Sequence, residues 1–159
     1  MSGGVEWALH CCVVLTAADR PVPAARLAEL LDVSASYLAK QMQALSRAGL
    51  IESVQGHSGG YVLTRSSAEI TVLDVVEAVD GATPPFICTE IRQRGPMATP
   101  AAECTTPCSI NRAMMSADRA WRMALRAVSV ADLARSATVE TGPGSLTDIR
   151  GWLGVPARL

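Results

Sequence analysis

The feature that most constrains the fold is a pair of short helical patterns joined by a tight turn. The first covers residues 23–31 and the second covers 34–48, and each places apolar residues at the spacing of one helical face. Ser34 is a favourable N-cap for the second helix, and Gly49 is a residue type that commonly follows a helix end. Two short helices joined in this way are typical of a helix-turn-helix.

A glycine-rich hairpin is predicted directly after these helices. Residues 50–55 and 61–64 have the composition of short strands, and the turn between them is Gly56-His57-Ser58-Gly59-Gly60. Such a hairpin after a helix-turn-helix is the wing of a winged helix. Further helices are predicted over 5–18 and 70–80. We therefore expect a mainly α fold with a small β-hairpin, in which residues 1–81 form a winged helix-turn-helix DNA-binding domain.

The remaining chain divides into three segments. Residues 82–108 form a loop that carries three cysteines, and residues 109–137 carry a long helical pattern in which residues 130–133 either continue the helix or start a new turn. A helix this long has more apolar surface than one small domain covers, which favours a dimerisation helix. Residues 138–159 form a tail rich in Gly and Pro, with a small apolar cluster at Ile149, Trp152 and Leu153.

The composition agrees with a helical fold and places few limits on the partner. Apolar residues make up 49% of the chain and aromatic residues 4%, so Ala, Leu and Val must build the core. The formal net charge is −1, which provides no global basic field, and residues 21–65 carry four basic against three acidic side chains. No apolar run approaches the roughly 18–20 residues of a membrane span. We expect a cytoplasmic protein.

A winged helix places the second helix of its helix-turn-helix in the major groove and its hairpin against the backbone or the minor groove. Hydroxyl groups and helix N-termini bind phosphates, while Lys and Gln side chains reach base edges. The residues predicted to contact operator DNA are Ser34, Ser36, Tyr37, Lys40, Gln41, Gln55, His57 and Ser58. Two alternatives remain open, because a winged helix can instead bind protein and Tyr37 can be a core aromatic residue.

Three of the five cysteines, Cys88, Cys104 and Cys108, follow the pattern C-x15-C-x3-C, which fits no common zinc finger. An odd number of cysteines in a reducing compartment favours free thiols, a metal or redox chemistry over structural disulfides. Thiolates are soft ligands that bind zinc or iron–sulfur clusters, and either metal group needs a fourth ligand here. Cys11 and Cys12 lie among apolar residues and are predicted to be buried.

Several further motifs occur in one order along the chain. They are Glu-x-x-x-His, Ser-x-Ser-Tyr-Leu, Gly-x-x-Gly-Gly-Tyr-x-Leu, Asp-Val-Val-Glu-Ala-Val-Asp-Gly and then the cysteine loop before a long helix. The combination resembles the iron–sulfur winged-helix repressors of the IscR, NsrR and RsrR type. The cysteine spacing and the segment Val-Glu-Trp-Ala-Leu-His-Cys-Cys are most similar to the RsrR type.

This resemblance implies a homodimeric transcriptional regulator, a repressor, that senses redox state through a 2Fe–2S cluster bound between subunits. It implies that Cys88 and Cys108 of one subunit and Glu6 and His10 of the other hold the cluster. Cys104 is then a spare thiol, and its role stays open between an alternative ligand, a resolving thiol and an inert residue. Glu6 and His10 lie four positions apart, so they share one helical face. Oxygen and nitrogen ligands in place of thiolates raise the reduction potential of a cluster, as in Rieske centres.

Other functions remain open. A zinc- or thiol-based regulator on the same fold would need no iron, and an iron–sulfur repressor can also sense nitric oxide. A Glu and a His four apart commonly form only a surface hydrogen bond. An enzyme with Cys88 or Cys108 as nucleophile would need a base such as His10 or His57, and no acidic orienter or oxyanion loop accompanies either histidine. We therefore expect no enzyme activity, no small-molecule substrate and no membrane partner.

Overall fold

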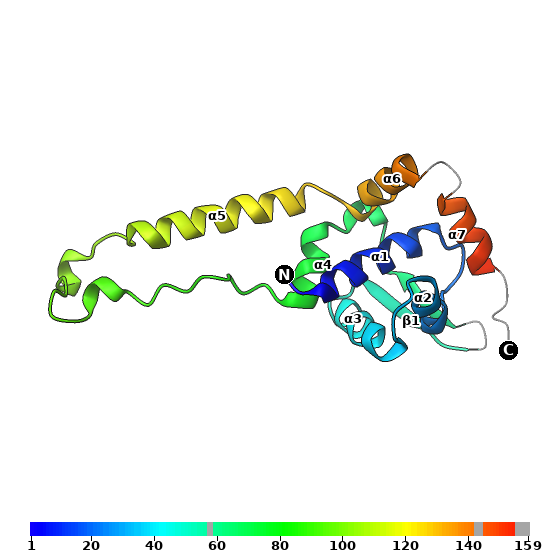
Figure 1. Ribbon diagram of the computed structural model, residues 1–159, viewed down its shortest axis with the longest axis horizontal. Coiled ribbons are helices and arrows are strands. Elements are labelled where there is room, and N and C mark those ends of the chain that lie inside the picture. Colours follow the sequence, from blue (N-terminus) through cyan, green and yellow to red (C-terminus); the bar gives the residue numbers. More distant parts are fainter. Residues whose placement is uncertain (57–58, 142–144, 155–159) are drawn as a thin grey trace. The chain divides into compact units, whose positions relative to one another are not determined.

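Figure 1 shows a computed structural model of the chain, which describes residues 1–56, 59–141 and 145–154. The chain divides into two compact units, and each is described by itself. One comprises Met1–Gly81 with Leu125–Leu159, and the other comprises Ala82–Ala124. The described residues form seven α-helices and one two-stranded antiparallel sheet. Within these residues, none of the helices has the length and apolar character to cross a membrane.

The helix-turn-helix is confirmed. It consists of α2 (Ala24–Leu30) and α3 (Ala35–Arg47). Ser34 caps α3, because its Oγ accepts a hydrogen bond from the backbone N–H of Tyr37 at 3.3 Å. The chain leaves the helix through Gly49, whose φ of 68° lies in the left-handed region.

The hairpin is confirmed as well. Strands β1 (Ile51–Val54) and β2 (Gly60–Leu63) pair antiparallel, with Ile51 opposite Leu63. Tyr61 also bridges to Val22 in the segment before α2: Val22 N donates to Tyr61 O at 3.0 Å, and Tyr61 N donates to Val22 O at 2.9 Å. The hairpin is therefore anchored to the helix-turn-helix by backbone hydrogen bonds.

Helix α1 (Gly3–Ala17) is the central helix of the first unit and contacts α3, α4, α6 and α7. Cys11 and Cys12 are fully buried in its core-facing side, as predicted, and burial raises the pKa of each thiol to about 12. They are protonated packing residues at neutral pH.

The predicted fourth helix is α4 (Val72–Asp80), and a reciprocal capping box between Thr71 and Asp74 fixes its start.

The single long helix predicted over 109–137 is interrupted. Helix α5 (Ser109–Arg126) ends, and α6 (Val130–Thr141) begins after an extended segment. This segment pairs with the residues before α4: Val72 N donates to Val128 O at 2.8 Å, and Val130 N donates to Ile70 O at 2.8 Å. Periodicity alone does not reveal the break, because the pairing partner lies more than fifty positions away in the chain.

The start of α6 has a local signal that the periodicity obscures. The backbone N–H of Asp132 donates to Ser129 Oγ at 3.1 Å, and the backbone N–H of Ser129 donates to Asp132 Oδ2 at 2.8 Å. This reciprocal arrangement is a capping box formed by Ser and Asp three residues apart. The pair therefore specifies a new helix and not a continuation of α5.

Part of the predicted tail is a helix that packs on the first unit. Helix α7 (Ser145–Gly154) contacts α1 and α6. The Arg26 guanidinium lies 3.6 Å from the centroid of the Trp152 ring, and Arg26 Nη2 donates to Trp152 O at 2.7 Å. Arg26 is only 8% exposed, so its charge is held largely by contacts inside the protein.

We expect Trp152→Ala to lower the free energy of unfolding by about 1–3 kcal/mol, because it removes a half-buried aromatic side chain and a desolvated cation–π contact. Trp152→Phe keeps a ring over Arg26 and is expected to have a smaller effect. Urea denaturation followed by circular dichroism measures both variants. A Trp152→Ala variant as stable as the wild type would contradict the docking of α7.

Candidate functional site

Two of the three loop cysteines lie side by side in the second unit. The Sγ atoms of Cys88 and Cys108 are 3.9 Å apart, although the residues are 20 positions apart in the chain. Cys88 lies in the extended segment after α4, and Cys108 immediately precedes α5. This segment runs beside α5 (Figure 1). Arg122 Nη2 of α5 also donates a hydrogen bond to Ala82 O at 2.8 Å. The loop therefore closes on itself and presents two thiols at one end of α5.

The first turn of α5 supports the Cys108 thiolate. The backbone N–H of Asn111 donates to Cys108 Sγ at 3.3 Å, so the thiol acts as a cap of the helix. This hydrogen bond lowers the pKa of Cys108 below its ordinary value. The thiolate is the form that binds a metal, and a helix N-terminus is a common place for a thiol of lowered pKa. The hydrogen bond from Asn111 therefore favours the thiolate form of Cys108.

The carboxylate of Glu90 lies beside the two thiols, and the sequence pattern did not identify this residue. Glu90 Oε1 lies 3.5 Å from Cys88 Sγ, and a Glu90 oxygen and the Sγ atoms of Cys88 and Cys108 all lie within 4.8 Å of one another. The Glu90 backbone is left-handed, with φ 51° and ψ 51°, and this turn places its carboxylate beside the thiols. The spacing Cys-x-Glu was visible, but no Gly or Asn signals a left-handed residue there.

Arg92 orients the Glu90 carboxylate. Arg92 Nε donates to Glu90 Oε2 at 2.7 Å, and this hydrogen bond lowers the pKa of Glu90 below its ordinary value. Arg92 Nη2 also donates to Thr106 O at 2.5 Å, which ties the segment around Glu90 to the segment before Cys108. Cys104 is half-buried and does not belong to the group of close donor atoms formed by Cys88, Glu90 and Cys108.

Glu6 and His10 lie in the first unit, on the exposed side of α1. Among the residues that the structure describes, neither side chain has a hydrogen bond or an ion pair, so the alternative of a Glu–His surface hydrogen bond does not apply here. Since the thiol pair belongs to the second unit, the set Glu6, His10, Cys88 and Cys108 remains a prediction.

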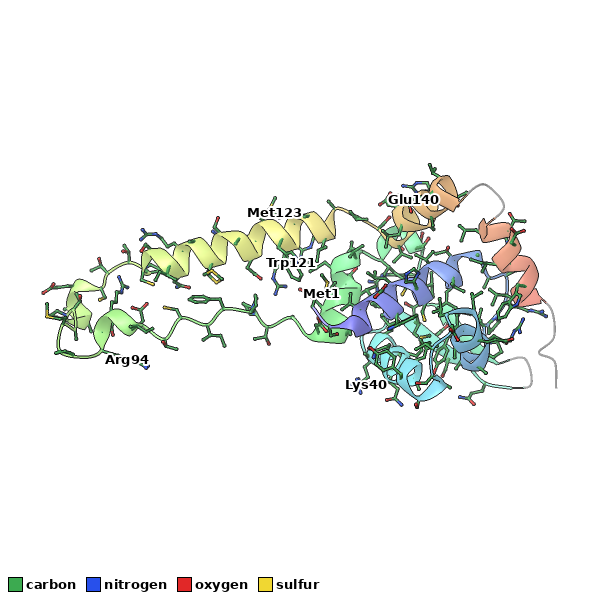
Figure 2. The ribbon with its side chains drawn as sticks, viewed as in Figure 1. Met1, Lys40, Arg94, Trp121, Met123 and Glu140 are labelled. Atoms are coloured by element: carbon green, nitrogen blue, oxygen red, sulfur yellow. The ribbon has the colours of Figure 1, made fainter. Side chains whose placement is uncertain are left out.

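The predicted DNA-contacting residues occupy the outer side of α3. The exposed residues of this set are Ser34, Ser36, Tyr37, Lys40 and, immediately after β1, Gln55. Figure 2 shows the Lys40 side chain projecting outward from α3. Tyr37 is 40% exposed, which contradicts the alternative of a core aromatic residue. His57 and Ser58 lie outside the described residues.

The prediction that Gln41 contacts DNA is wrong, because this side chain is buried. Its side chain is 5% exposed and lies against Gly4 of α1, where a Cβ atom would come within 2.6 Å of Gln41 Oε1. Glycine at position 4 allows α1 and α3 to approach closely, and Gln41 fills the contact. Gln41 therefore faces α1 and not solvent, and it is not part of the exposed surface of α3.

The winged helix with an exposed second helix and a thiol-bearing loop defines a class of transcriptional regulator. Residues 1–136 match the model of the Rrf2 family, described as iron-dependent transcriptional regulators. The chain belongs to this family. The family is one of regulators and not of enzymes.

Several named proteins are similar in sequence to parts of this chain. It is 33% identical to the protein aau3 of Rhizobium meliloti (strain 1021) over 110 residues, which cover 69% of this chain and 68% of that protein. It is 42% identical over 85 residues to the HTH-type transcriptional regulator YwgB of Bacillus subtilis (strain 168), covering 51% of this chain and 53% of YwgB. It is 41% identical over 68 residues to IscR of Photorhabdus laumondii, covering 43% and 42%. The chain thus spans about half the length of YwgB and IscR.

Solved structures show the same fold. CymR of B. subtilis, the global cysteine regulator, superposes with a TM-score of 0.68 at 22% identity, covering 86% of this chain and 96% of CymR. IscR of T. potens superposes with a TM-score of 0.60 at 21% identity, covering 86% and 87%. At these identities the likeness concerns the fold alone.

Proposed function

We propose that the protein is a homodimeric DNA-binding repressor that senses redox state through a 2Fe–2S cluster bound between its subunits. The observation that carries this proposal is the distance of 3.9 Å between the Sγ atoms of Cys88 and Cys108. Two thiolates on a tetrahedral metal, each with a metal–sulfur bond of about 2.3 Å, lie about 3.8 Å apart. The thiol pair therefore fits a single metal centre without rearrangement of the loop.

The two remaining ligands are assigned to Glu6 and His10 of the partner. Both side chains are exposed on one face of α1 and lack hydrogen-bond partners among the described residues, so they are available to a second subunit. A bound cluster supplies one-electron redox chemistry. The chain holds and orients it: Asn111 N–H stabilises the Cys108 thiolate, and α1 carries Glu6 and His10 on the helix that packs against α3. A change at these ligands is thereby transmitted toward the DNA-contacting helix.

The exposed apolar residues of α5 support the homodimer. No side chain of α5 is buried within the chain. Ile110 is 66% exposed, Met114 40% and Trp121 38%, and their spacing places them along one side of the helix. A continuous apolar stripe of this kind is typical of a helix that packs against another helix. A second copy of α5 is the partner we assign to it.

Replacing Lys40 tests the proposed DNA-binding surface of α3. We expect Lys40→Ala to weaken operator binding by about tenfold, since a side chain of this type that reaches a base edge contributes about 1–3 kcal/mol. Arg119→Ala is the matched control, because it removes one exposed positive charge from α5 and is expected to change binding less than Lys40→Ala does. Electrophoretic mobility shifts at one fixed salt concentration measure both. Equal effects of the two variants would contradict an α3-centred surface.

Anaerobic purification of the full chain tests the proposed cofactor. The dimer is expected to be coloured, to contain iron and inorganic sulfide in equal amounts, and to give an electron paramagnetic resonance signal after one-electron reduction.

The distance of 3.9 Å between the thiols also favours a second candidate, a thiol-based regulator in which an oxidant takes two electrons and two protons to form a Cys88–Cys108 disulfide. A colourless protein whose DNA affinity changes with disulfide formation would support that candidate and contradict the cluster.

A further inference from the structure

We propose that Cys88, Glu90 and Cys108 of a single chain form a second kind of metal site, for one thiophilic divalent cation such as Zn²⁺ or Fe²⁺, when no cluster is bound. The inference shares the thiol pair with the proposed function. It differs because it needs neither Glu6 nor His10, and it needs no second subunit. It also gives a role to Glu90, which the cluster ligand set leaves unused.

The distances between donor atoms fit one tetrahedral cation. With a zinc–sulfur bond of about 2.3 Å and a zinc–oxygen bond of about 2.1 Å, the sulfur atoms are separated by about 3.8 Å and a sulfur and an oxygen by about 3.6 Å. The structure has 3.9 Å between Cys88 Sγ and Cys108 Sγ, and 3.5 Å between Cys88 Sγ and Glu90 Oε1. Cys88 is therefore already spaced from both Cys108 and Glu90 as ligands of one cation are, and all three donors lie within 4.8 Å of one another.

The hydrogen bonds around Glu90 direct one of its oxygens toward the thiols. Arg92 Nε donates a hydrogen bond to Glu90 Oε2 at 2.7 Å. The other oxygen, Glu90 Oε1, lies beside the Cys88 thiol. Arg92 is itself held by Thr106 O, so the carboxylate cannot turn away without losing its hydrogen bond from Arg92 or pulling Arg92 away from Thr106. Outer partners that orient ligands in this way commonly change metal affinity by about 10–100-fold.

The charges balance as well. Two thiolates and one carboxylate carry three negative charges, and a divalent cation together with the Arg92 guanidinium carries three positive charges. Without a cation the three acidic groups still lie close together. The protonated thiol of Cys88 then donates a hydrogen bond to Glu90 Oε1. The left-handed backbone of Glu90 keeps the carboxylate in this position, a conformation that is uncommon for a residue other than Gly.

Titration of the metal-free, reduced full chain with Co²⁺ under anaerobic conditions tests the site. We expect about one Co²⁺ per chain, with thiolate-to-cobalt charge-transfer absorption and the visible bands of a tetrahedral centre, and displacement by Zn²⁺. Glu90→Gln is expected to weaken Co²⁺ binding by about tenfold or more. Glu103→Gln, which changes an exposed carboxylate in the same loop, is the matched control and is expected to bind Co²⁺ like the wild type.

A double variant, Glu6→Ala with His10→Ala, separates the two proposals. It is expected to lose the cluster and to keep Co²⁺ binding. Loss of Co²⁺ binding in this variant, or undiminished binding in Glu90→Gln, would overturn the site. A wild type that binds Co²⁺ through Glu90 but never assembles a cluster would overturn the proposed function alone. Circular dichroism of each variant establishes that the fold is retained.

Discussion

Replacing Cys88 or Cys108 by serine is expected to reduce the iron and inorganic sulfide contents of the purified dimer at least about tenfold. The Sγ atoms of both residues lie 3.9 Å apart, so in the proposed cluster each supplies one of two adjacent positions on the same iron. A serine hydroxyl is a hard ligand that is protonated at neutral pH, so it cannot replace the soft thiolate. Metal and sulfide analysis of anaerobically purified protein measures the effect.

Cys104→Ser is the control for these variants. Cys104 lies in the same loop and is half-buried like the other two residues, but it does not belong to the close group of donor atoms. We expect this variant to keep its cluster. If Cys104→Ser lost as much iron as Cys88→Ser, Cys104 would be a ligand and the assignment of the thiol pair would be wrong.

Gly60→Ala is expected to lower the free energy of unfolding by about 3 kcal/mol, the upper part of the range for overpacking. A Cβ atom on Gly60 would lie 2.3 Å from the carbonyl carbon of Val22 and 2.5 Å from its oxygen. These are backbone atoms, and the bridge between Val22 and Tyr61 holds them in place. The strain must therefore be relieved by moving β2, which would also displace the wing from the DNA surface.

Gly151→Ala is the matched control for the backbone effect of alanine. A Cβ atom there meets nothing within 4 Å, and the residue lies inside α7. Because alanine is a better helix former than glycine, we expect this variant to be as stable as the wild type or more stable by up to about 1 kcal/mol. Urea denaturation of both variants provides the comparison. Equal stabilities would contradict the tight packing of β2 against Val22.

The parts of the fold that follow from local signals could be predicted from the sequence. Ser34 at the start of α3 and the capping box at Thr71 define helix starts through neighbouring residues. The break between α5 and α6 depends on pairing between Val130 and Ile70, and the docking of α7 depends on Arg26. These contacts join residues that are far apart in the chain, and periodicity carries no information about them.

The same distinction applies to the candidate site. The spacing of the cysteines identified a thiol-bearing loop, and the resemblance to a known family selected Cys88 and Cys108. Glu90 was missed because its approach to the thiols depends on a left-handed turn, and Gln41 was misassigned because its burial depends on the absence of a side chain at Gly4. For Glu90 the deciding factor is a backbone conformation, and for Gln41 it is the close contact between α1 and α3 at Gly4. Neither follows from the type of the residue itself.

A mixed dimer tests whether each proposed cluster is shared between the two subunits. One chain carries Glu6→Ala with His10→Ala, and the other carries Cys88→Ser with Cys108→Ser. Different affinity tags allow the mixed dimer to be isolated after co-expression. Each chain then lacks half of the ligand set, and the two homodimers of these variants serve as controls that are expected to hold no cluster.

If the ligands come from two subunits, one of the two symmetry-related sites in the mixed dimer is complete. We expect about one cluster per mixed dimer, half the loading of the wild type, measured as iron and inorganic sulfide with the matching visible spectrum. A mixed dimer without iron or sulfide, prepared alongside a fully loaded wild type, would contradict the shared site.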